Sequence, residues 1–150
     1  MKIALDTNVL AYAEGINGAP MRDKTLELLQ RLSPVNVVLP VQVLGELFNA
    51  LVRKAKRRPA RARAALLSWR DAYSTVETSG TVMVSAADLA SDIGLTIWDS
   101  VVLAAAAEAD CRLLLSEDLQ DGFTWHGVTV VNPFAAVLHP LLAAASQEPR

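Results

Sequence analysis

The sequence predicts an α/β fold in which helices cover both faces of a mainly parallel central sheet of about four to five strands. Four short apolar runs, at residues 3–5, 37–39, 113–115 and 128–131, have the composition of buried strands. Helix-like stretches lie between most of them, and wholly apolar strands separated by helices are typical of parallel sheets. Because 52% of the 150 residues are hydrophobic, we expect one domain with a sizeable core.

The helices are predicted from apolar residues at helical spacing. A leucine-rich face indicates a helix over residues 22–32, and Pro40 suits the first turn of the next helix. Pro59 ends that helix, and residues 60–73 form another. Further along the chain, we expect a short strand or extended link at 82–84, a short helix from Ser85 to about Gly94, and a helix over 98–109.

The domain is predicted to cover residues 1–142, and the tail 143–150 is expected to fray. The longest apolar run spans residues 101–107, far below the roughly 20 residues that cross a bilayer. The chain shows no signal-peptide pattern, and Cys111 is its only cysteine, so an internal disulfide is excluded. A soluble, cytoplasmic protein without a membrane partner is therefore expected.

Half of the basic residues lie in one short segment. Residues 53–63, here called the basic cluster, hold seven of the fourteen lysines and arginines and no acid. Such a segment can bind a polyanion, or it can be a solvated connection between two helices that aids solubility. Both interpretations stay open, because no aromatic residue that could stack on bases is interleaved from 53 to 65.

Acidic residues recur where strands end and helices begin. Asp6 directly follows the first strand, while Asp118 and Asp121 follow the strand at 113–115. Glu46 and Asp99 lie in or near the first turns of two helices. Each has an ordinary structural interpretation: a helix cap for Asp6, a solvated polar stripe for Glu46, a capping box for Asp99, and a polar loop for the last two.

These acids are expected to meet at one edge of the sheet. In a parallel sheet, the carboxyl ends of strands and the starts of the following helices share an edge. Crowded carboxylates need a counter-charge, and all-oxygen ligands favour Mg²⁺ or Mn²⁺. His126 and His139 have no partner at a suitable spacing, which argues against zinc.

The ordered set of motifs resembles PIN-domain ribonucleases, in particular VapC-type toxins of toxin–antitoxin pairs. The resemblance covers nearly the whole chain and rests on four short segments. These are Leu5-Asp6-Thr7-Asn8-Val9-Leu10, Val43-x-x-Glu46, Trp98-Asp99-Ser100 before an alanine-rich helix, and Leu115-Ser116-Glu117-Asp118 with Val130-Val131-Asn132-Pro133. One local departure is Gly122, which stands where many relatives carry an aromatic residue, with Phe123 one place later.

The resemblance implies a PIN-like fold and an acidic pocket made of Asp6, Glu46, Asp99 and Asp118, with Asp121 as an auxiliary ligand. Ser116 matches the small hydroxyl residue that precedes the fourth acid. The resemblance also implies a Mg²⁺ or Mn²⁺ requirement, RNA as substrate, a homodimer, and a cognate antitoxin that covers the site.

We therefore expect a metal-dependent endoribonuclease whose acids hold one or two ions that activate water. Thr7, Asn8 and Ser116 would support the ligands, and Asp6 is expected to matter little for folding. The residues of the basic cluster that would bind RNA phosphates are Arg53, Lys54, Lys56, Arg57, Arg58 and Arg61.

Three other functions remain open at this point. One is a housekeeping RNA-processing nuclease of the same fold, and another is a non-catalytic protein that acts by interaction through an acidic pocket. A phosphoryl-transfer enzyme of the haloacid-dehalogenase type is disfavoured, because that class resembles Asp-x-Asp and this chain carries Asn8 in the second position.

Overall fold

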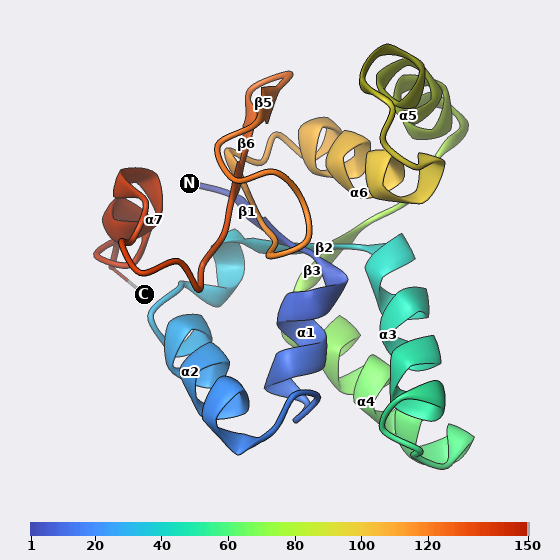
Figure 1. Cartoon of the computed structure of the whole chain (residues 1–150), viewed down its shortest axis with the longest axis vertical. Coiled ribbons are helices and arrows are strands. Elements are labelled where there is room, and N and C mark those ends of the chain that lie inside the picture. Colours follow the sequence, from blue (N-terminus) through green and yellow to red (C-terminus); the bar gives the residue numbers. More distant parts are fainter. Residues whose placement is uncertain (150) are drawn as a thin grey trace.

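Six strands form one sheet in the order β3-β2-β1-β4-β6-β5 in the computed structural model, which describes residues 1–149 (Figure 1). The strands are β1 (Ile3–Leu5), β2 (Val37–Pro40), β3 (Ser74–Val76), β4 (Leu113–Leu115), β5 (Thr124–Trp125) and β6 (Val128–Val131). The helices are α1 (Thr7–Ala13), α2 (Ala19–Gln30), α3 (Val41–Arg53), α4 (Pro59–Ala72), α5 (Gly80–Ile93), α6 (Ile97–Glu108) and α7 (Pro140–Ala145), with a 3₁₀ turn at Pro34–Asn36.

The sheet is parallel except at one edge, as predicted. β1 lies at its centre, where Ile3 is opposite Val37 of β2 and Leu113 of β4. β6 extends the parallel sheet beyond β4, and only β5 runs antiparallel, as a short hairpin with β6. β1, β2 and β4 are buried at every position, which explains why their sequences are wholly apolar instead of alternating.

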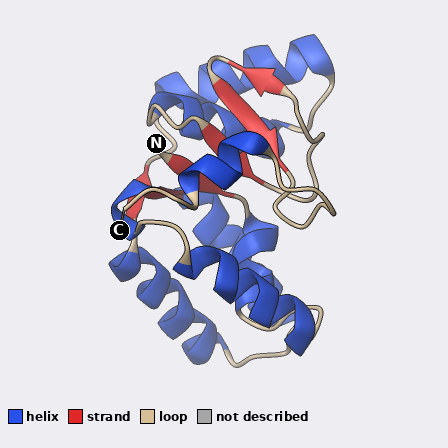
Figure 2. Cartoon of the chain, turned by 90° about the vertical axis from the view of Figure 1, so that its left-hand side faces the viewer, coloured by secondary structure: helices blue, strands red, loops and turns tan. Residues whose placement is uncertain are grey.

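Helices cover both faces of the sheet (Figure 2). α6 packs across β2, β3, β4 and β6, and α5 packs on the far side of α6. This double cover explains why every residue from Ser100 to Ala106 is buried. The helices α1 to α4 form the lower group in Figure 1, where α1 contacts α2 and α3, and α3 contacts α4.

Two sequence predictions for the middle of the chain are wrong. Residues 82–84 belong to α5, which begins at Gly80 after Ser79 caps it by accepting from the Val82 amide at 3.1 Å. The sequence analysis did not predict β3, because this strand lies at the edge of the sheet and two of its three residues are polar and exposed. Pro40, expected inside the helix, instead ends β2. The predicted helix end near Gly94 is confirmed, since Gly94 adopts φ 74° there.

The first residues of the tail that was expected to fray, 143–145, belong to a helix in the structure. α7 continues to Ala145, and its Leu142 and Ala145 are buried against the core. Beyond it, the Glu148 carboxylate accepts a hydrogen bond from Asn36 Nδ2 at 3.3 Å. Alanine-rich composition hid this docking because small residues carry little hydrophobic signal. Across residues 1–149, every helix is too short or too polar to span a bilayer.

Candidate active site

Strand register brings Asp6 and Ser116 together at the carboxyl edge of the sheet. Leu5 pairs with Leu115 in the parallel β1–β4 ladder, so the next residue of each strand emerges at the same level. The Asp6 amide donates to Leu115 O at 2.9 Å, which extends the ladder by one step. Both side chains are buried, with Asp6 6% exposed and Ser116 fully covered.

A hydrogen-bond network joins two of the predicted acids. Ser116 Oγ donates to Asp6 Oδ2 at 2.7 Å. Asn8 Nδ2 lies 3.3 Å from Asp118 Oδ2, 3.3 Å from Ser116 Oγ and 3.5 Å from Asp6 Oδ2. An amide nitrogen carries two hydrogens, so these three acceptors share them. Asn8 Oδ1 in turn accepts from the Glu117 amide at 3.1 Å, which fixes the orientation of the Asn8 side chain.

Asp6 also caps α1, so the structural interpretation of this residue is correct. Its Oδ1 accepts from the Thr7 amide at 2.8 Å at the first turn of the helix. The expectation that Asp6 matters little for folding is therefore not supported by the structure, because a cap of this kind contributes about 1 kcal/mol. The two roles are compatible, since one carboxylate oxygen caps the helix and the other faces Ser116.

The acids interact electrostatically. Burial raises the pKa of Asp6, the hydrogen bonds from Ser116 and Thr7 oppose this, and the negative charges of Asp99 and Asp118 raise the pKa further. Burial likewise raises the pKa of Glu46, and the charges of Asp6 and Asp99 add to the effect. Asp6 thus lies within electrostatic reach of Glu46, Asp99 and Asp118, and Glu46 lies within reach of Asp99.

Within residues 1–149, no three acidic, histidine or cysteine side chains stand at metal-binding spacing in the conformation seen here. The donor set nevertheless fits a hard divalent cation, because it consists of carboxylate, amide and hydroxyl oxygens. The buried Thr7 hydroxyl lies beside the Glu46 carboxylate and opposes the rise in the pKa of Glu46. Binding a cation would require the carboxylates to rotate toward one another.

Three neighbouring acids have defined structural contacts. Asp121 Oδ1 accepts from the Asn132 amide at 2.9 Å and so braces the turn that precedes β5. Gly122 follows in that turn with φ 87°, a conformation that a glycine tolerates and an aromatic residue does not. Glu117 accepts from the Tyr12 hydroxyl at 2.7 Å, away from Asp6. The N-cap half of the predicted capping box is present, because the Asp99 amide donates to Thr96 Oγ1 at 3.1 Å.

The basic cluster divides into residues with different surroundings. Arg57 donates to Glu14 Oε1 at 2.7 Å and to Glu14 O at 2.6 Å, and Trp69 Nε1 donates to Glu14 Oε2 at 2.9 Å. Arg57 is therefore engaged within the protein. Arg61 lines a shallow hollow on α4, whereas Arg53 and Lys54 line a cavity that also contains Glu46.

This cavity, here called the α1–α3 cavity, has a volume of about 420 Å³. Sequence reasoning missed two polar residues that line it, namely Tyr12 and Asn17, whereas Asn49 belongs to the polar stripe that carries Glu46. The signal for Tyr12 was present, because it lies four residues after Asn8 on the same face of α1. The complete lining is Thr7, Asn8, Ala11, Tyr12, Ile16, Asn17, Glu46, Asn49, Ala50, Arg53, Lys54 and Asp118.

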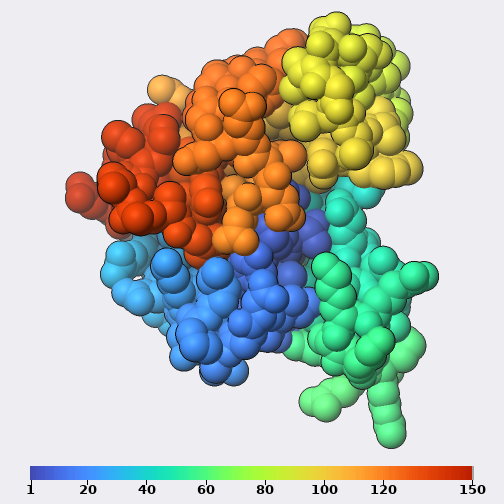
Figure 3. Space-filling view, in the orientation of Figure 1, coloured from blue at the N-terminus to red at the C-terminus, as the bar shows by residue number. Residues whose placement is uncertain are grey.

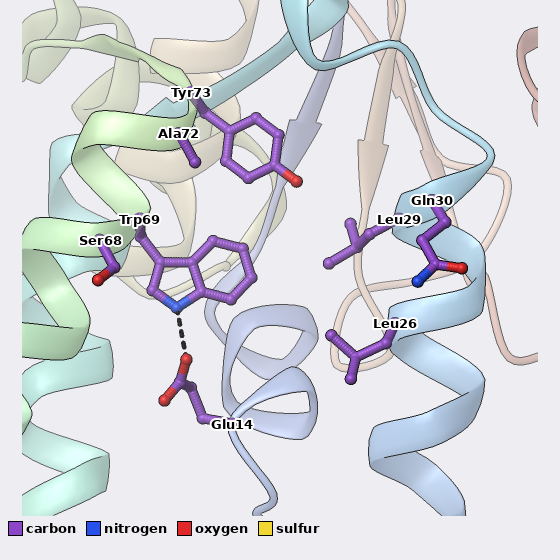
Figure 4. A pocket seen from close by; sticks show the side chains of 8 residues that line it. All are labelled: Glu14, Leu26, Leu29, Gln30, Ser68, Trp69, Ala72 and Tyr73. Carbon is purple, nitrogen blue, oxygen red and sulfur yellow. Dashed lines mark hydrogen bonds between the residues drawn. The ribbon is translucent and has the colours of Figure 1, made fainter.

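A second hollow of about 370 Å³ lies between α2 and α4 (Figure 4). Leu26 and Leu29 of α2 face Trp69 of α4 and Tyr73, which follows α4, across this hollow, and Glu14 closes one end. Its lining is mainly apolar, and its one acid is already paired with Arg57 and Trp69. By contrast, the α1–α3 cavity is lined by Glu46 and Asp118 together with Arg53 and Lys54, whereas Asp6 and Asp99 do not line it.

Comparison with known proteins identifies similar sequences and folds. The family model of the PIN domain matches residues 3–121. No curated protein matches the chain significantly.

Among solved structures, similarity is found to the VapC20 toxin of Mycobacterium tuberculosis, described as cleaving the sarcin–ricin loop. It is 18% identical with a TM-score of 0.66, over 78% of this chain and 92% of that chain. A toxin–antitoxin complex from Klebsiella pneumoniae is 20% identical with a TM-score of 0.67, over 89% and 98%. The FitAcB structure from Neisseria gonorrhoeae is 18% identical with a TM-score of 0.66, over 88% and 98%. At these identities, the structural likeness establishes the fold.

Proposed function

The chain belongs to the PIN-domain family, and on that premise we propose that it is a metal-dependent endoribonuclease, the toxin of a type II toxin–antitoxin module. PIN domains are nuclease domains, so the fold is suited to phosphodiester cleavage. The observation that carries the proposal is the network at the sheet edge, in which Asn8 and Ser116 connect the carboxylates of Asp6 and Asp118.

The proposed ligands of Mg²⁺ or Mn²⁺ are Asp6, Glu46, Asp99 and Asp118, with Asp121 as an auxiliary. When bound, the ion would lower the pKa of a coordinated water and offset charge on the scissile phosphate. Burial and mutual repulsion make the ionised carboxylates costly in the free protein, which favours binding of a cation. Without a cation, the same charges repel the RNA backbone.

The remaining residues of the site act on the ligands. Ser116 and Asn8 donate to carboxylate oxygens and hold them at the sheet edge, as groups around a metal ligand commonly do. Thr7 contributes its amide to Asp6, and its buried hydroxyl supports the Glu46 carboxylate. A tyrosine hydroxyl is protonated at neutral pH, and burial and then Glu117 raise the pKa of Tyr12 further, to about 12. It therefore acts as a hydrogen-bond donor.

The proposed partners are an RNA substrate, a cognate antitoxin and a second copy of the chain. The similar structure from Klebsiella pneumoniae is a toxin–antitoxin complex, which supports an antitoxin as partner. An antitoxin is expected to cover the acidic site and stop cleavage. The gene for such a protein would be a small reading frame adjacent to the gene for this chain, encoding a DNA-binding fold.

The decisive experiment measures RNA cleavage by the purified protein with Mg²⁺, with Mn²⁺ and with EDTA. We expect cleavage with either ion, none with EDTA, and a loss of about 100-fold or more in Asp6→Asn and Asp118→Asn. Ser91→Ala, an exposed change on α5, is the matched control and should cleave at the parent rate. A folded Asp6→Asn variant that cleaves at the parent rate, or cleavage that persists in EDTA, overturns the proposal and favours a protein that acts by interaction.

A further inference from the structure

The α1–α3 cavity is charged with opposite signs at its two ends. Glu46 and Asp118 lie at the end next to the sheet, while Arg53 and Lys54 lie at the far end of α3. The neutral polar residues Tyr12, Asn17 and Asn49 line the space between them. Figure 3 shows α1 in blue beside α3 in teal, with the α3–α4 connection in green projecting at the lower right. A ligand that fills this cavity therefore meets carboxylates at one end, neutral polar side chains in the middle and basic side chains at the other end.

One face of α3 carries an acid, an amide and a base in line. Glu46, Asn49 and Arg53 follow at i, i+3 and i+7, which puts them on one face of the helix. At 1.5 Å per residue, Arg53 lies about 10 Å beyond Glu46 along the axis. This offset is longer than the distance between two successive phosphates of one strand, so the long side chains of Arg53 and Lys54 would have to reach back toward Glu46 to bind the phosphate next to one held at the acidic end. The cavity volume of about 420 Å³ suits a small organic group of this size.

The other basic residues do not serve this cavity. Arg57 is held by Glu14, and Arg61 lines the hollow on α4. Lys56 and Arg58 are exposed in the connection between α3 and α4 and do not line the cavity. Two of the six residues that the sequence suggested for RNA binding are therefore placed to bind a phosphate next to the acids.

We propose that the α1–α3 cavity is a subsite for the nucleotide adjacent to the scissile phosphate. Arg53 and Lys54 bind the neighbouring phosphate, while Asn17 and Asn49 contact the ribose or base. This inference rests on the proposed ribonuclease function and adds residues that determine specificity. Amide side chains both donate and accept, so they can hydrogen-bond to an unstacked base of single-stranded RNA.

The first test compares two double variants with equal loss of charge. The double change Arg53→Ala and Lys54→Ala should raise the KM for a short RNA about tenfold and leave kcat within about twofold. It should also reduce the salt dependence of RNA binding by about one phosphate contact. Arg58→Ala with Arg63→Ala removes two exposed charges outside the cavity and should change KM by less than about twofold.

The second test reads specificity and binding separately from turnover. Asn49→Ala should broaden or change the nucleotide found beside the cleavage site in a random RNA pool, whereas the exposed control Gln147→Ala should not. Binding is measured by fluorescence anisotropy of a labelled hexaribonucleotide on the Asp6→Asn background with Mg²⁺. There, the Arg53 and Lys54 changes should weaken binding about tenfold.

The outcomes separate the two proposals. If the parent cleaves RNA but the double variant at Arg53 and Lys54 does not differ in KM or in its anisotropy curve from the double variant at Arg58 and Arg63, the subsite is overturned. The ribonuclease function then stands. If the parent cleaves no RNA with either metal, the ribonuclease function is overturned, and the subsite with it.

Discussion

At the scale of single residues, Asp6 and its neighbours serve the fold and the site together. One carboxylate oxygen of Asp6 caps α1 and the other accepts from Ser116. Asn8 connects Asp6, Ser116 and Asp118 with one amide group. Because stability and chemistry share these groups, substitutions here need a measurement of folding beside every measurement of activity.

Ser116→Ala is expected to weaken Mn²⁺ binding about 10- to 100-fold, because Asp6 loses the hydroxyl that orients it. Unfolding should become easier by about 1 kcal/mol through the lost hydrogen bond. Isothermal titration calorimetry with Mn²⁺ and urea denaturation measure the two effects. Ser91→Ala is the control, since Ser91 is exposed on α5. An unchanged Mn²⁺ affinity in Ser116→Ala would contradict the assigned role.

Cys111 should be unreactive in the folded protein. Its side chain is 4% exposed, and burial raises the pKa of the thiol from 9.0 to about 11. At pH 8, a shift of that size leaves about 100-fold less thiolate, so alkylation by iodoacetamide should be at least that much slower than in guanidinium. Equal rates in the folded and unfolded protein would disprove the burial argument. The raised pKa also predicts that stability falls as the pH rises from about 9 toward 11.

At the scale of elements, the connection between α3 and α4 is held to the end of α1. Arg57 and Trp69 both donate to Glu14, which follows α1 directly. These bonds are partly shielded, since the Arg57 and Glu14 side chains are 29% and 22% exposed. The contact therefore sets how α4 packs beside α1, and with it the position of the hollow between α2 and α4.

Arg57→Ala should lower the free energy of unfolding by about 1.5–3 kcal/mol, the range for hydrogen bonds to a charged group. RNA affinity measured on the remaining folded protein should stay within about twofold of the parent. Arg63→Ala, an exposed change on α4, should alter stability by less than about 0.5 kcal/mol. The reverse pattern, with unchanged stability and weaker RNA binding, would return Arg57 to the RNA-binding residues. Urea denaturation and fluorescence anisotropy distinguish the two.

At the scale of the whole molecule, the sheet edge concentrates negative charge, which makes stability depend on pH. The pKa of Asp6 and that of Glu46 lie above their ordinary values of 3.8 and 4.5 in the folded protein. The folded state therefore holds protons that the unfolded state has released, and the stability that this provides is lost as the pH rises through the raised pKa values.

The melting temperature of the metal-free protein should accordingly fall as the pH rises from about 4 toward neutrality. Comparison with Asp6→Asn corrects this fall for the contribution of the other acids. In that variant the fall should be smaller, because one charge is gone and Glu46 loses a repelling neighbour. Mg²⁺ should raise the melting temperature of the parent at pH 8 more than that of Asp6→Asn. Differential scanning fluorimetry measures all three; equal pH slopes in both proteins would contradict the electrostatic argument.

The sequence by itself determined the central strands and the acids that follow them. Wholly apolar runs such as residues 113–115 can only be buried, and polar residues directly after them must lie at the edge of the sheet. The same rule predicted that Asp6, Glu46, Asp99 and Asp118 approach one another. It failed at β3 and α7, because exposed edge strands and alanine-rich helices leave a weak hydrophobic pattern.

Only the tertiary structure decided which charges are free and which are paired. The basic cluster is uniform in sequence, yet Glu14, 43 residues away, engages Arg57 while Arg53 and Lys54 remain in the cavity beside Glu46. Asn8 likewise reaches Asp118 across 110 residues. Contacts of such long range depend on strand order and helix packing, which local periodicity does not specify. The physical reason is that pairing is set by distance in space, whereas the sequence orders residues along the chain.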